Sequence, residues 1–137
     1  MNRPPFLKAS VTNTLLQLVA AMATPSVSPS GQLGVAPFQN KEVLNLAYQN
    51  VYNPNSTVVF LQFFDAASTG AVTLGTTAPL ASFAIPPSSS GSSGLLSESY
   101  PSDCRLSFKL GVVVAVTSTQ AGNGSPGSVC QLMAQFI

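Results

Sequence analysis

The chain has 137 residues, of which 45% are apolar and only 7% are charged, with a formal net charge of +1. This length fits one domain with a buried core, and five cations cannot form the basic surface that several nucleic-acid phosphates require. There is no His, and the carboxylates Glu42, Asp65, Glu98 and Asp103 form no recognisable motif. We therefore expect a non-enzymatic protein without cofactor, metal or nucleic acid.

The first 23 residues can be interpreted as a secretory signal, with an apolar stretch over residues 15–23 and a mature chain beginning at Thr24. The same stretch also fits a short amphipathic helix over about residues 14–23. Its apolar face would carry Leu15, Leu18, Val19 and Met22. We favour the helix, because Pro4, Pro5 and the polar residues 12–14 lead poorly into a signal core. This stretch of nine residues is too short to cross a bilayer, which takes about 20 apolar residues, so no membrane anchor is expected.

A Pro/Ser/Gly linker over residues 24–34 follows this predicted helix. The sequence thus predicts an N-terminal arm over residues 1–34 and a β domain over residues 35–137. Such an arm could reach a neighbouring subunit. The alternative is that it folds back over its own domain.

From residue 35 onward the pattern is one of short strands separated by turns. In residues 41–52, Leu44, Leu46 and Tyr48 are expected on one face and Gln49 on the other. Residues 57–64 are apolar on both faces, as in a central strand. Further strands are predicted at 71–74, 80–85, about 95–100, 104–108, 110–117 and 129–136, with a surface loop at 88–93.

Strand length and turn spacing predict the fold class. We expect an all-β protein: a single β-sandwich or jelly-roll-like domain of about 7–8 antiparallel strands, preceded by the arm. Four phenylalanines are expected in its core and not on a binding surface. They are Phe60, Phe63, Phe64 and Phe108.

Four motifs follow one another along the chain: Val51-Tyr52-Asn53-Pro54-Asn55, the aromatic strand 59–65, the Gly-Thr turn in 72–79 and the Gly-centred run 108–117. In this order they resemble small structural proteins of tailed bacteriophages, over about residues 43–136. The resemblance implies a virion β-sandwich, with a capsid decoration (cement) protein as the favoured role. It would bind the outer capsid surface and bridge neighbouring subunits after assembly in the host cytoplasm.

This role implies the major capsid protein as partner, and a homo-oligomer in which a trimer is favoured. A charge-poor surface agrees with assembly, because a net charge near zero favours association. The candidate inter-subunit contacts are Pro4, Pro5, Phe6, Leu15, Leu18, Val19 and Met22.

Two other roles stay open. A tail, fibre or baseplate component could bind host glycans through Tyr48, Tyr52 or Tyr100. A secreted carbohydrate-binding or pilus-like module would begin at Thr24. Cys104 and Cys130 could form a bridge in a secreted protein, whereas assembly in a reducing cytoplasm favours two free, buried thiols.

Overall fold

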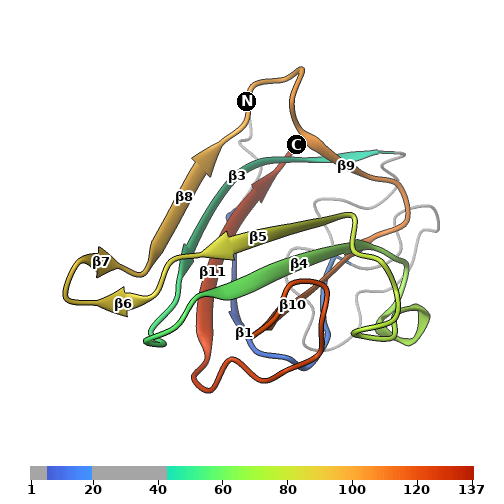
Figure 1. Ribbon diagram of the computed structural model, residues 1–137. Helices are drawn as coiled ribbons and strands as arrows, with labels where there is room; N and C mark the ends of the chain where they lie inside the picture. Colours follow the sequence, from blue (N-terminus) through green and yellow to red (C-terminus); the bar gives the residue numbers. More distant parts are fainter. Residues whose placement is uncertain (1–5, 20–42) are drawn as a thin grey trace.

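The computed structural model of the protein describes residues 6–19 and 43–137, which form two facing antiparallel sheets (Figure 1). The larger sheet contains β1 (Phe6–Val11), β11 (Cys130–Phe136), β3 (Leu44–Tyr52) and β8 (Leu95–Ser99) in that order, and β9 (Leu106–Phe108) also pairs with β3. The smaller sheet has the order β2 (Leu16–Val19), β10 (Val112–Thr117), β4 (Val59–Asp65) and β5 (Ala81–Ile85). The predicted all-β sandwich is confirmed.

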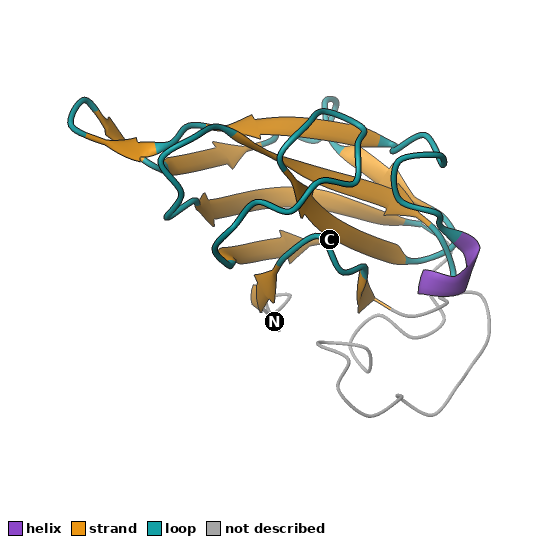
Figure 2. Ribbon diagram, turned by 60° about the horizontal axis from the view of Figure 1, so that its bottom comes forward, coloured by secondary structure: helices purple, strands orange, loops and turns teal. Residues whose placement is uncertain are grey.

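The chain crosses repeatedly between the two sheets. β1, β3, β8 and β11 belong to the larger sheet, whereas β2, β4, β5 and β10 belong to the smaller one. Eight main strands in two sheets with these crossings form a jelly roll. A short hairpin of β6 (Ser88–Ser89) and β7 (Ser92–Ser93) projects from one end of the sandwich (Figures 1 and 2).

Residues 6–19 belong to the sandwich, so the predicted boundary between an arm and a domain is wrong for this segment. β1 pairs with β11 over its whole length, and β2 pairs with β10. The predicted helix is also wrong over Leu16–Val19, which is strand β2; residues 20–23 and the predicted linker lie outside the described residues. Leu16, Gln17 and Leu18 fit a strand as well as a helix, and pairing with β10 decides between the two.

The core lies between the sheets and contains alternate residues of the long strands. Phe63 from the smaller sheet packs on Phe108, whose ring centroid is 5.9 Å away, and Phe108 packs on Phe136 at 5.8 Å. Phe63, Phe64 and Phe108 are buried as predicted, whereas Phe60 is half-buried. β10 is buried at all six positions, because both of its faces are covered.

A β-bulge in β3 changes which of its residues face the core. Gln135 lies opposite Tyr48, but the next residue, Phe136, lies opposite Leu46, so Ala47 is the extra residue of β3. Leu44 and Leu46 face inward before the bulge, and Gln49 faces inward after it. The predicted single alternation is therefore wrong beyond Ala47, and Tyr48 lies on the outer face.

One strand prediction and one loop prediction also differ from the structure. Residues 71–74 form no strand: a 3₁₀ turn, η2 (Thr69–Ala71), leads into a turn in which the Thr73 N–H donates to Thr77 Oγ1 at 2.9 Å. The serine-rich segment 88–93 forms the β6–β7 hairpin in place of an irregular loop. The chain reverses there at Ser90 and Gly91, which small side chains permit.

The side chain of Asn53 joins the loop after β3 to the end of β5 at one end of the sandwich. It is fully buried, and its Nδ2 donates to the carbonyl oxygens of Thr57 at 2.9 Å, Pro86 at 3.1 Å and Ile85 at 3.4 Å. Its Oδ1 accepts hydrogen bonds from the backbone N–H and the Nδ2 of Asn55, both at 2.9 Å. These contacts satisfy an amide that would otherwise be costly to bury.

Gly94 completes this junction. Its carbonyl accepts a hydrogen bond of 2.7 Å from the Asn53 N–H, and its φ of +72° favours glycine. A Cβ atom at this position would overlap with Ser88 Oγ and with the Asn53 carbonyl oxygen. The turn therefore requires a glycine for both space and backbone conformation.

Candidate functional site

The outer face of the smaller sheet is covered by the chain's own loops. On this side Phe64, Val113, Ala66 and Val72 form a second buried apolar cluster beneath the loop after β4. Further along the same face, buried Gln62 donates to Thr117 Oγ1 at 2.6 Å and to the Gly122 carbonyl at 3.2 Å. The loops over residues 66–80 and 118–124 thus leave little of this face for a partner.

Among the residues that the structure describes, no loop covers the outer face of the larger sheet in this way. Strand register places its side chains in three rows across β1, β11, β3 and β8. The rows are Phe6–Gln135–Tyr48–Ser99, Lys8–Met133–Asn50–Ser97 and Ser10–Gln131–Tyr52–Leu95. We call this surface the open face, because none of these side chains is buried.

Hydrogen bonds and ring contacts order the side chains of the open face. The Phe6 and Tyr48 rings make an edge contact with centroids 5.7 Å apart. Tyr48 Oη shares a hydrogen bond of 3.2 Å with Ser97 Oγ and accepts one of 3.4 Å from Asn50 Nδ2. These hydrogen bonds, first from Ser97 and then from Asn50, lower the pKa of the Tyr48 phenol.

A shallow depression of about 280 Å³ lies in the middle of the open face. Its lining includes Tyr52, Asn50, Gln131, Met133 and Lys8. The Tyr52 side chain is 40% exposed, and Ser10 Oγ donates to Gln131 Oε1 at 3.2 Å, which orients the amide. The depression thus combines an exposed aromatic ring with amide groups and one cation.

The open face carries almost no charge. Lys8 is the one cationic side chain in its three rows. Glu98 lies between Ser97 and Ser99 on β8, but its side chain projects from the opposite side of the sheet. The surface therefore suits a neutral or weakly acidic partner that offers apolar and hydrogen-bonding groups.

The structure separates the residues predicted to make inter-subunit contacts. Phe6 lies on the open face and is 48% exposed. Leu18 and Val19 are buried in the core, so these two predictions are corrected, whereas Leu15 is partly buried and packs against the cluster of Phe64. Their apolar character reflects packing within the sandwich. Pro4, Pro5 and Met22 lie outside the described residues.

The three tyrosines proposed for glycan binding have different environments. Tyr52 lines the depression and Tyr48 lies beside Phe6 on the open face. Tyr100 packs partly on the core, where its Oη accepts a hydrogen bond of 2.7 Å from Gln49 Nε2. Desolvation raises the pKa of Tyr100. Two of the three are therefore placed for contact with a partner, and the bulge at Ala47 explains why Tyr48 is one of them.

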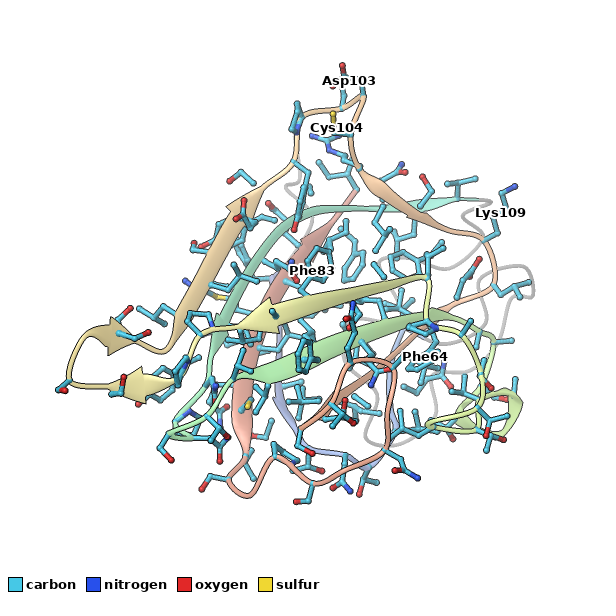
Figure 3. All side chains as sticks on the ribbon, in the orientation of Figure 1. Phe64, Phe83, Asp103, Cys104 and Lys109 are labelled. Atoms are coloured by element: carbon cyan, nitrogen blue, oxygen red, sulfur yellow. The ribbon has the colours of Figure 1, made fainter. Side chains whose placement is uncertain are left out.

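Both cysteines are free thiols, so the alternative of a bridge between Cys104 and Cys130 is not observed. Only Cys130 is buried, however, and Cys104 is exposed in the loop at one end of the molecule (Figure 3). β11, which begins with Cys130, starts at the opposite end of the sandwich (Figure 1). Burial raises the pKa of Cys130 to about 11, so this thiol stays protonated near neutral pH.

Within residues 6–19 and 43–137, no group of three or more His, Cys, Asp or Glu side chains could hold a metal ion. In the same ranges, no helix is long and apolar enough to cross a membrane. No protein-family model matches the sequence, and no curated protein matches it significantly. The open face is therefore the candidate site on structural grounds alone.

Proposed function

We propose that the chain is a non-enzymatic structural protein of a bacteriophage virion, and that its open face binds the outer surface of the capsid as a decoration protein. The observation that carries this proposal is the difference between the two sheets. Loops of the chain itself cover the smaller sheet, whereas the described residues leave the open face uncovered. A decoration protein that bridges capsid subunits needs such a broad, ordered surface and does not need catalytic residues.

The composition of the open face supports an interface role. Tyr48, Tyr52, Phe6 and Met133 are of the residue types enriched at protein interfaces, and amides and hydroxyls separate them. The jelly roll agrees with the proposal only by analogy, since viral capsid domains and lectins share this fold. The contact surface proposed here replaces the predicted arm: of its candidate contact residues that the structure describes, only Phe6 lies on the open face.

The test is co-sedimentation of the full-length protein with purified capsid shells of the phage that encodes it. Tyr52→Arg adds a second cation beside Lys8, and its matched control, Leu80→Arg, alters a side chain that is 44% exposed just before β5 in the smaller sheet. We expect Tyr52→Arg to weaken binding about 30-fold or more, as for a central interface aromatic, and Leu80→Arg to bind like the wild type. Equal binding by both variants would contradict the proposal.

A second candidate function is a tail or fibre component that binds glycans. The depression favours it, because the Tyr52 ring can stack on a sugar while Asn50 and Gln131 hydrogen-bond its hydroxyl groups. This function would be favoured over capsid decoration if the protein bound glycans on an array, if Tyr52→Ala abolished that binding, and if the protein did not bind capsid shells. The secreted alternative, with its start at Thr24, would remove β1 from the larger sheet and β2 from the smaller one.

A further inference from the structure

Strand β8 forms an edge of the larger sheet (Figure 1), and among the described residues it pairs only with β3. Two hydrogen bonds fix the direction of its backbone groups: the Gly94 carbonyl accepts from Asn53 N–H, and the Tyr100 N–H donates to the Ala47 carbonyl at 2.9 Å. In an antiparallel ladder, alternate residues point toward the same neighbour. Leu96 and Glu98 therefore face β3.

The backbone N–H and C=O groups of Leu95, Ser97 and Ser99 consequently point away from the sheet. Natural proteins protect such edges with proline, lysine, bulges or very short strands. β8 has none of these over five residues, and its register with β3 is continuous from Tyr48–Ser99 to Tyr52–Leu95. Its single charge, Glu98, lies on the side opposite the open face. With respect to the described residues, this edge is continuous in register, neutral on the open face and available for strand pairing.

We infer that β8 pairs antiparallel with β8 of a second copy of the chain, about a two-fold axis at Ser97. In this register Ser97 lies opposite its own counterpart, and Leu95 lies opposite Ser99 of the partner. The outward groups of these three residues then form a complete set of ladder hydrogen bonds. Glu98 lies opposite Leu96, so no like charges face each other directly.

The pairing joins two open faces into one continuous surface. It goes beyond the proposed function and does not depend on capsid binding, since it concerns the protein alone in solution. A two-fold pair yields a dimer, whereas the sequence favoured a trimer. Because a single strand pair buries less than a standard interface, we expect an equilibrium that depends on concentration.

The first test measures the mass of the full-length protein by sedimentation across a concentration series. We expect the mass to rise from 14.1 kDa toward twice that value. Ser97→Pro removes an outward N–H that β3 does not use and should weaken pairing about ten-fold or more while the fold is kept. Ser97→Ala removes only the hydroxyl group and should dimerise like the wild type. A wild type that stays monomeric at about 1 mM, a trimer, or a Ser97→Pro variant that still dimerises normally would overturn the inference.

The second test reads the register by disulfide formation in a Cys104→Ser background, which removes the exposed native thiol. In Ser97→Cys, the two Cα atoms across the axis would lie about 5.5 Å apart, within disulfide range. In Ser99→Cys they would lie about 14 Å apart. We expect a covalent dimer from Ser97→Cys only. Equal cross-linking of the two variants, or of neither, would rule out this register.

Discussion

Replacement of Asn53 by alanine tests the account of how the sandwich end is held together. Asn53 makes four contacts of 2.9–3.1 Å, with the carbonyls of Thr57 and Pro86 and with two nitrogens of Asn55. At about 1 kcal/mol net for each hydrogen bond, their loss amounts to about 4 kcal/mol. The longer contact to the Ile85 carbonyl, at 3.4 Å, adds to this loss. Since domains are stable by only about 5–15 kcal/mol, Asn53→Ala should be severely destabilising.

The assay is urea denaturation of the wild type and two variants, with thermal unfolding as a second probe. For a chain of this length, a loss of about 4 kcal/mol lowers the Tm by about 12–20 °C. Asn50→Ala is the matched control, because Asn50 lies three residues before Asn53, on β3, and its side chain makes one long contact, of 3.4 Å, to Tyr48 on the open face. We expect the control to change the free energy of unfolding by less than about 0.5 kcal/mol. A loss below about 1 kcal/mol for Asn53→Ala would refute the reasoning.

Three further predictions concern the same fold. Gly94→Ala should cost more than about 2 kcal/mol in denaturation experiments, because φ is positive and the methyl group would overlap with its neighbours, whereas Gly91→Ala, with open space around it, should be nearly neutral. Iodoacetamide at pH 8 should add one group to the native protein, at exposed Cys104, and two in urea; rapid double labelling of the native protein would contradict the burial of Cys130. Burial raises the pKa of Tyr100 in the folded state, so its contribution to stability should be complete below pH 10 and should fall as the pH rises through the folded-state pKa. In a series of denaturation experiments above pH 10, Tyr100→Phe should make this fall in stability less steep. An unchanged pH dependence in the variant would contradict the role of Tyr100.

Local sequence patterns predicted the strands in which each face stays either buried or exposed along the whole strand. β4, β5, β10 and β11 follow the expected ranges closely, because continuous apolar runs or strict alternation mark them. The alternation of Cys130, Leu132, Ala134 and Phe136 is observed as predicted, with these residues buried and the intervening ones more exposed.

Features that depend on distant pairing were not predictable in the same way. Leu15, Leu18 and Val19 are spaced as on a helix, and only the presence of β10 as a neighbour makes Leu16–Val19 a strand. The bulge at Ala47 has no local sequence mark, yet it turns Tyr48 outward and Gln49 inward. The open face was therefore missed, because two of its three aromatic side chains were assigned elsewhere: Phe6 to an arm, and Tyr48 to the face of Leu44 and Leu46.

The most direct measurement of the central claim is a cryo-EM map of the purified virion at a resolution that places side chains. The account predicts that this chain lies on the outer capsid surface, with Tyr52 and Met133 of the open face against the capsid protein and the loop-covered smaller sheet directed away. A particle that lacks the chain, or a bound chain whose open face points into solvent, would contradict it.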